Sequence, residues 1–278
     1  MVSSSIALGA PWGMTGSTPL PVNLPQLEGL DLKARYHSDR CNGDFFDGVA
    51  IGSRVVFLLM DIAGRRAEAH PIAAEVQNVF RTRAQDLFES PDANESEAIA
   101  LLVHDVNRSL MEAAHGVRFA PAFLGCFNLT LGILTYHNAG RILAVFHDAN
   151  SVRVLEPGGI PLGLFTHSTY EPAVLAFEPR SKLLLVTKGI TESRRGAAVY
   201  GGERVSRLLQ NSSTDSASRI CEAVLREAYD FGHHPWSCVY DLLHLRKPCR
   251  KDDLTAVTLV RPAGSELSAI RTAGKAHR

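Results

Sequence analysis

Acidic side chains that could bind a metal ion occur in three short motifs that are far apart in this sequence. The motifs contain Asp44 and Asp47, then Asp61, and near the end of the chain Asp252 and Asp253. Carboxylates without a paired His or Cys favour Mg²⁺ or Mn²⁺ over Zn²⁺. Two such ions about 3.5–4 Å apart could activate a water molecule and hold a phosphate for in-line attack. We therefore interpret the three motifs as parts of one hard-cation site.

The element that must position Asp61 is the segment Arg54–Asp61, RVVFLLMD. Its continuous apolar run is typical of a strand buried on both faces. A carboxylate at the end of such a strand loses its hydration, which a cation, a metal or several N–H donors must offset. Taken alone, Asp61 is more simply explained as a turn residue that caps the next element.

The first acidic motif is expected in a loop beside this strand. Leu32–Tyr36 alternates like a strand, and Gly48–Ser53 has the composition of a turn. We therefore predict a hairpin between Leu32–Tyr36 and Arg54–Asp61 whose loop carries Asp44 and Asp47. This pairing would bring Asp44 close to Asp61.

Two amphipathic helices follow the Asp61 motif. Apolar residues recur at helical spacing over Arg66–Phe88 and again from about Glu95 to His115. Asn94 and Glu97 resemble a capping box at the start of the second helix. The two helices are predicted to form an antiparallel pair that lies on a sheet.

The rest of the chain is mainly short strands, followed by two helices and a last strand. The predicted strands lie within 122–154, then at Val174–Phe177, Lys182–Val186 and Asp253–Arg261, and the helices at Gly202–Leu209 and Ser213–Tyr229. The order indicates an α+β fold with helix-covered sheets. We predict a flexible N-terminal extension over residues 1–28, one domain over 29–262 and a C-terminal tail over 263–278.

Composition excludes several classes of protein. Of 278 residues, 45% are hydrophobic and 21% charged, and 29 basic residues balance 29 acidic ones. This balance gives no general field that would favour nucleic acid or an anionic membrane. No apolar run is long enough for membrane insertion, and Met1–Ala10 lacks the features of a secretory signal. The five scattered cysteines fit reduced thiols, so a cytoplasmic location is expected.

With these motifs, the chain resembles the metal-dependent protein phosphatases (PPM, the protein phosphatase 2C superfamily), in the bacterial branch similar to stage II sporulation protein E. The family motifs correspond to Gly43–Asp47, Asp61–Gly64, Pro161–Gly163, Leu183–Glu192, Gly202–Arg204 and Asp252–Thr255. The resemblance implies an α-β-β-α sandwich, in which two packed β-sheets are flanked by helix pairs.

The resemblance also implies roles for the matched residues. Asp61 would bridge two Mn²⁺ or Mg²⁺ ions, with Asp44 and the backbone carbonyl of Ile62 on one ion and Asp252 on the other. Asp47 and Asp253 would be secondary members of the site. The implied reaction is direct hydrolysis of phosphoserine or phosphothreonine without a phosphoenzyme. A candidate substrate is a phosphorylated anti-sigma factor antagonist in a partner-switching pathway.

The chain departs from the family where a Thr-Asp-Gly motif is expected, because it has Thr187-Lys188-Gly189. A protonated lysine has no lone pair to give a metal ion. Between Asp61 and Asp252, Lys188 would repel a cation and could replace its charge through salt bridges. The alternative is that Lys188 points to solvent and leaves a weakened site with one of its two ions lost.

Two further departures lie near the expected site. Arg65 stands where many relatives have a small or histidine-containing run. The Asn-Ala-Gly-His-x-Pro loop corresponds either to Asn138–Arg141 or to His147–Asn150, and neither has the His-Pro part.

A second metal centre is an alternative for the segment before Asp252. This segment contains His233, His234, Cys238, His244 and Cys249. Their spacing matches no structural zinc template, so an inserted loop that shapes substrate access is the simpler interpretation.

Two functional hypotheses follow. One is a Mn²⁺- or Mg²⁺-dependent serine/threonine phosphatase of weakened activity, favoured by Asp44, Asp61 and Asp252. The other is a pseudophosphatase that acts as a binding module, favoured by Lys188. The three retained aspartates favour the first hypothesis, and the pseudophosphatase is the alternative.

Overall fold

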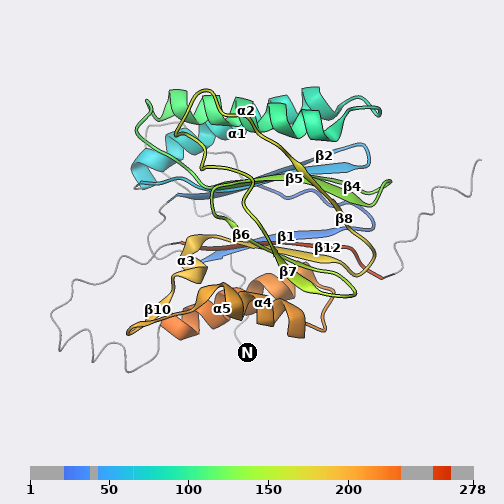
Figure 1. Cartoon of the computed structure of the whole chain (residues 1–278), viewed down its shortest axis with the longest axis vertical. Coiled ribbons are helices and arrows are strands. Elements are labelled where there is room, and N and C mark those ends of the chain that lie inside the picture. Colours follow the sequence, from blue (N-terminus) through green and yellow to red (C-terminus); the bar gives the residue numbers. More distant parts are fainter. Residues whose placement is uncertain (1–21, 38–42, 65, 233–252, 264–278) are drawn as a thin grey trace, which may run out of the picture.

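Two stacked β-sheets with helices on both outer faces form the molecule (Figure 1). A computed structural model describes residues 22–37, 43–64, 66–232 and 253–263. From one face to the other, the layers are a helix pair, a five-stranded sheet, a second five-stranded sheet and a second group of helices. The predicted α+β sandwich is therefore confirmed.

The first sheet has the strand order β2-β3-β4-β5-β8 and is antiparallel throughout. Its strands are β2 (Asp44–Ile51), β3 (Arg54–Asp61), β4 (Ala122–Asn128), β5 (Ile133–Ala139) and β8 (Ala173–Ala176). All eight residues of β3 are buried, as the apolar run predicts for a strand covered on both faces.

The second sheet has the order β1-β12-β9-β6-β7 and is also antiparallel. Its strands are β1 (Asp31–His37), β12 (Leu254–Val260), β9 (Lys182–Val186), β6 (Leu143–His147) and β7 (Val152–Leu155). A small hairpin of β10 (Arg194–Arg195) and β11 (Ala198–Val199) follows β9 in the chain.

Helices α1 (Arg66–Phe88) and α2 (Glu95–Ala113) cover the first sheet. The Asn94 side chain accepts hydrogen bonds from the backbone N–H groups of Ser96 and Glu97, which caps α2 as predicted. The second sheet is covered by α3 (Lys188–Thr191), α4 (Gly201–Asn211) and α5 (Ala217–Gly232). No helix in the described part of the chain is long and apolar enough to cross a membrane.

The predicted hairpin between Leu32–Tyr36 and Arg54–Asp61 is wrong. Strand β1 pairs with β12 in the second sheet, whereas β3 pairs with β2, so Asp44 and Asp47 lie in a strand and not in a loop. The turn is confined to Gly52 and Ser53, with Gly52 at φ +58°, which fits a tight two-residue hairpin. Alternation identifies a strand but does not identify its partner.

In the described part of the chain, three apolar cores fill the spaces between the layers. One lies between α1, α2 and the first sheet, one between the two sheets, and one between the second sheet and its helices. Phe57 and Phe123 of the first sheet and Phe146 of the second are buried in the inter-sheet core. Because the sheets share this core, strand ends from both are held at one edge of the molecule.

Candidate functional site

Asp44 and Asp61 are directly opposite each other in the register of β2 and β3. The backbone of this region is anchored by hydrogen bonds from Asp61 N to Pro121 O and from Ile62 N to Gly43 O, both 3.0 Å. Two carboxylates at facing positions repel each other, and burial removes the water that would screen them. The adjacent pair is therefore a place where a positive charge is favoured.

The pKa of Asp44 is raised well above its usual value. Burial is the largest cause, followed by repulsion from Asp61, while the hydrogen bond from the Thr187 hydroxyl acts in the opposite direction. An added cation or a proton would therefore stabilise the buried Asp44 carboxylate.

Thr187 connects the two sheets at this point. Its hydroxyl donates to Asp44 Oδ2 over 2.6 Å, and its Oγ1 accepts from the backbone N–H of Thr255 over 3.2 Å. Its own N–H donates to Thr255 O. In the sequence, Thr187 is noticeable only as part of the altered Thr187-Lys188-Gly189 motif. Its position at the end of an apolar strand, as for Asp61, is the signal that could have identified it.

Lys188 begins α3, directly after Thr187, and its ammonium lies 3.5 Å from Asp61 Oδ2. The Lys188 side chain is 47% exposed, whereas that of Asp61 is 9% exposed. The positively charged end of Lys188 therefore lies between solvent and the buried Asp61 carboxylate.

The other acidic candidates are distributed differently. Asp253 is buried, and its Oδ2 accepts from Gly43 N over 3.3 Å, which brings it to the same edge. Asp47 points to α1, where its carboxylate is bound by Arg81 Nε at 2.7 Å and Nη2 at 3.1 Å. Asp47 therefore has a local structural partner away from Asp61. Asp252 lies outside the described residues, as do Arg65 and the His233–Cys249 segment.

Ile62 has its backbone carbonyl close to Gly43. A Cβ atom at position 43 would stand 2.0 Å from Ile62 O, so the close approach of these two segments requires glycine. The implied metal-binding carbonyl thus lies against the motif that carries Asp44.

The Asn138–Arg141 run, rather than His147–Asn150, lies at the Asp61 end of the sheets. Ala139 pairs with Ala122, which itself pairs with Met60, and Gly140 adjoins Pro161 of the Pro161–Gly163 loop. His147 pairs with Lys182, at the opposite end of β9 from Thr187. The structure thereby favours the first of the two registers.

The described residues fit one cation better than two. Among them, no group of three or more His, Cys, Asp or Glu side chains could hold a metal ion. Asp44 and Asp61 supply carboxylate oxygens of the kind that Mg²⁺ and Mn²⁺ prefer. The ammonium of Lys188, 3.5 Å from Asp61 Oδ2, adds a positive charge next to this pair of carboxylates.

The sequence matches the family described as Stage II sporulation protein E (SpoIIE) over residues 51–261. Protein IcfG of Synechocystis is 22% identical over 245 residues, a match that covers 80% of this chain and 38% of IcfG. The chain thus spans less than half the length of this curated relative.

Solved structures with the same fold include the RsbU and RsbW domains of Rv1364c from Mycobacterium tuberculosis. That match has a TM-score of 0.64 and 24% identity, and covers 87% of this chain and 64% of the other. The SpoIIE phosphatase domain with a regulatory fragment, from Bacillus subtilis, matches with a TM-score of 0.62 and 15% identity over 83% of this chain and 63% of the other.

A third fold match is the catalytic domain of the serine/threonine phosphatase PstP, solved with 2 manganese ions. It has a TM-score of 0.57 and 13% identity, and the match covers 84% of this chain and 100% of PstP. Similarity at this level shows the shared fold. Together with the sequence match, which covers well over half of the chain, it leads to one conclusion: this chain belongs to the SpoIIE family of PPM-type phosphatase domains.

Proposed function

We propose that this chain is a pseudophosphatase, a phosphatase-fold domain that binds a phosphoprotein without turning it over efficiently. The observation that carries the proposal is the 3.5 Å ion pair between Lys188 and Asp61. Asp61 is the carboxylate that the family resemblance assigns to both metal ions. An ammonium at this carboxylate supplies one positive charge permanently and repels an added cation.

The rest of the site supports a binding role. Thr187 donates to Asp44 and accepts from the backbone N–H of Thr255, and Asp253 accepts from the backbone N–H of Gly43, so the edge is ordered by hydrogen bonds among its own residues. A lysine also binds phosphate well as a point charge. Lys188, half-exposed beside this edge, is suited to contact a phosphoryl group that arrives from solvent.

A weak metal-dependent serine/threonine phosphatase is the second candidate. It is favoured by the facing Asp44 and Asp61 carboxylates. Burial and repulsion from Asp61 raise the pKa of Asp44, and a bound cation would offset both effects. In that case Asp44, Asp61 and the Ile62 carbonyl would hold one Mn²⁺ or Mg²⁺ ion, with Asp252 as a further ligand. The ion would supply Lewis-acid stabilisation of the phosphate.

The natural partner in either case is a phosphorylated protein. The family resemblance points to an anti-sigma factor antagonist in a partner-switching pathway. The fold match to a chain that carries both RsbU and RsbW domains supports a role in such a pathway.

The test compares Mn²⁺ binding by the parent protein and by Lys188→Asp in isothermal titration calorimetry. We expect the variant to bind Mn²⁺ at least about tenfold more tightly, because it exchanges a repelling charge for a ligand. Hydrolysis of p-nitrophenyl phosphate should be absent or weak in the parent and should rise in Lys188→Asp.

Two control variants distinguish the effect of removing the Lys188 charge from the effect of adding a carboxylate ligand. Lys188→Gln removes the ammonium without adding a carboxylate, and Arg194→Asp makes the same change of charge at an exposed residue of β10. Lys188→Gln should be intermediate, and Arg194→Asp should behave like the parent. Parent hydrolysis that a chelator abolishes, at a rate similar to that of Lys188→Asp, would refute the pseudophosphatase and support the one-ion enzyme.

A further inference from the structure

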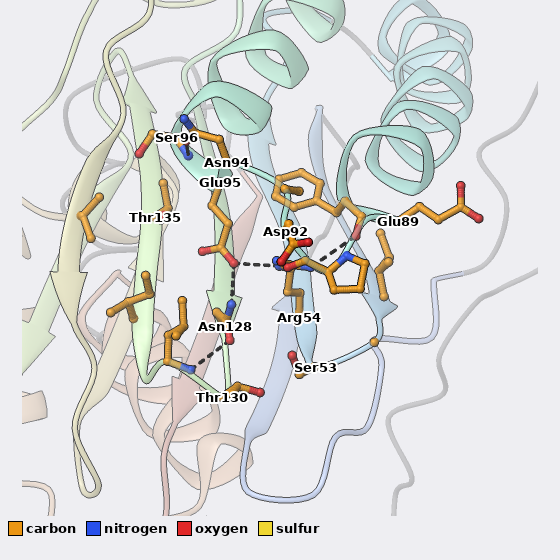
Figure 2. A pocket seen from close by; sticks show the side chains of 18 residues that line it. Ser53, Arg54, Glu89, Asp92, Asn94, Glu95, Ser96, Asn128, Thr130 and Thr135 are labelled. Atoms are coloured by element: carbon orange, nitrogen blue, oxygen red, sulfur yellow. Dashed lines mark hydrogen bonds and ion pairs between the residues drawn. The ribbon is translucent and has the colours of Figure 1, made fainter. Parts of the chain in front are cut away.

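A pocket of about 730 Å³ lies at the end of the first sheet that is opposite to Asp61 (Figure 2). It is lined by the β2–β3 turn, the α1–α2 connection and the β4–β5 turn, with Thr135 and Val174 from β5 and β8. Arg54 begins β3 and Asp61 ends it, so about 23 Å of extended strand separates the pocket from the candidate site. Its volume is in the usual range for small-molecule sites, roughly 300–1,000 Å³.

The guanidinium of Arg54 lies at the base of the pocket, and most of its N–H groups donate hydrogen bonds to the protein. Its Nη1 donates to the carbonyls of Phe88 and Ser90, and its Nη2 donates to Pro91 O over 2.6 Å. Its Nε donates to Glu95 Oε1 over 2.7 Å. Four of the five guanidinium N–H groups therefore donate to groups of the protein itself, which leaves little of Arg54 for an anionic ligand.

Glu95 has one oxygen engaged and one free of partners. Oε1 accepts from Arg54 and also from Asn128 Nδ2 over 2.6 Å. Oε2 has no hydrogen-bond partner among the described residues, and it is shielded from solvent, since the Glu95 side chain is only 7% exposed. Figure 2 shows this oxygen on the side of Glu95 away from Arg54, toward the strand that carries Thr135. Buried carboxylate oxygens normally accept a hydrogen bond, so a ligand with an N–H or O–H donor could bind to Oε2.

The charge and polarity of the lining specify the kind of donor. The lining includes three acidic residues, Glu89, Asp92 and Glu95, and one basic residue, Arg54, although Figure 2 shows the Glu89 side chain directed away from Arg54. Much of the remaining lining is apolar, from Ile51, Phe88, Pro91, Leu131, Ile133 and Val174. A hard metal ion needs six or more oxygen ligands, which an apolar lining does not provide.

We propose that this pocket binds a small organic ammonium compound, a primary amine with an apolar body. The ammonium donates to Glu95 Oε2 and is attracted by Asp92, while the apolar body packs on Ile133 and Val174. Because Oε2 is buried, binding requires a movement of the lining that exposes this oxygen to the pocket. The proposal is independent of the chemistry at Lys188, because the two places lie at opposite ends of β3.

The test is isothermal titration calorimetry with phenethylamine and, as its neutral counterpart of similar shape, 2-phenylethanol. We expect the amine to bind at least about tenfold more tightly than the alcohol, which is typical for a hydrogen bond to a charged group. Equal affinity for the two compounds, or no amine binding at tens of millimolar, would overturn the proposal.

Two variants locate the binding site. Glu95→Gln should weaken amine binding about tenfold and leave alcohol binding nearly unchanged, whereas Glu156→Gln, an exposed carboxylate outside the pocket, should change neither. Val174→Trp should occlude the pocket without disturbing the core, since Val174 is 58% exposed. If Glu95→Gln does not fold, Val174→Trp still decides: an unchanged dissociation constant for phenethylamine excludes this pocket. Lys188→Asp should bind the amine like the parent.

Discussion

At the scale of single residues, the surroundings of a side chain determine which charge it can carry. Lys188 keeps its ammonium beside Asp61 because the carboxylate is buried and the lysine reaches it from solvent. Asp44, facing Asp61, depends on a hydrogen bond from Thr187. The lysine at position 188 therefore contributes to the charge balance of the whole edge.

His137 provides a test of this principle away from the candidate site. It is buried in β5, its Nδ1 lies 3.3 Å from the carbonyl oxygen of Glu171, and its Nε2 has no partner among the described residues. Burial lowers the pKa of His137, because the imidazolium loses its hydration. The folded protein therefore favours neutral His137.

We predict that this histidine makes the protein less stable in mild acid. The unfolded state takes up a proton near pH 6.5, whereas the folded state does so only at lower pH. The contribution of His137 to stability is thus present above about pH 6.5 and is lost as the pH falls through the lower folded pKa. Urea unfolding between pH 5 and 8 should show a flatter profile for His137→Gln than for the parent. Parallel profiles would contradict the prediction.

At the scale of elements, Arg54 and Glu95 fasten the α1–α2 connection to the first sheet. Arg54 binds carbonyls at the end of α1, and Glu95 stands at the start of α2, so each charge also matches the dipole of the helix end that it contacts. The side chains are 8% and 7% exposed, respectively. The two helices that cover the first core are therefore joined to β3 through one buried ion pair.

Breaking this ion pair from one side should be costly. Arg54→Met leaves Glu95 buried without its counter-charge, and we expect a loss of about 3–5 kcal/mol in the free energy of unfolding. The double variant Arg54→Met/Glu95→Met should lose clearly less than the sum of the two single variants, because no unpaired charge remains. Urea denaturation of all four proteins measures the coupling. Strict additivity would show that the two residues act independently.

At the scale of the whole molecule, the inter-sheet core holds the site together. Asp44 and Asp61 come from the first sheet, while Thr187 and Thr255 come from the second. Phe57, buried in this core, stacks on Phe123 with ring centroids 6.0 Å apart, and Gly125 leaves the space that its ring requires. Packing between the sheets therefore sets the position of one half of the site relative to the other.

Removing the Phe57 ring should weaken the whole fold. We expect Phe57→Ala to lower the free energy of unfolding by about 3–5 kcal/mol, since it leaves a cavity between two rigid sheets. Leu101→Ala, at a position 44% exposed on α2, is the control and should cost much less. Urea unfolding followed by circular dichroism measures both. Similar losses for the two variants would mean that the inter-sheet core is not the main source of stability.

Local pattern was sufficient for the long elements. The apolar spacing predicted α1 with both of its ends, and the start of α2 followed from Asn94. The buried run Val55–Met60 identified β3, which ends at Asp61. These features depend on neighbours within a few turns or residues of the chain, which a sequence displays directly.

Pairing over long distances could not be predicted in this way. Strand β1 pairs with β12 more than 200 residues later, and a strand pattern carries no information on its partner. The four-residue helix α3 was missed because it is too short to show a period. The Arg54–Glu95 pair was missed because its two residues lie 41 positions apart and neither belongs to a motif.

The sequence by itself determined the family, the helix pair on the first sheet and the three acidic motifs, because these depend on residue types in short, ordered runs. The tertiary structure decided which of those residues meet: Asp44 with Asp61 and Thr187, Lys188 with Asp61, and Asp47 with Arg81 instead of the site. The physical reason is that a charge acquires its role from its burial and its partners, and both arise only when the two sheets pack together.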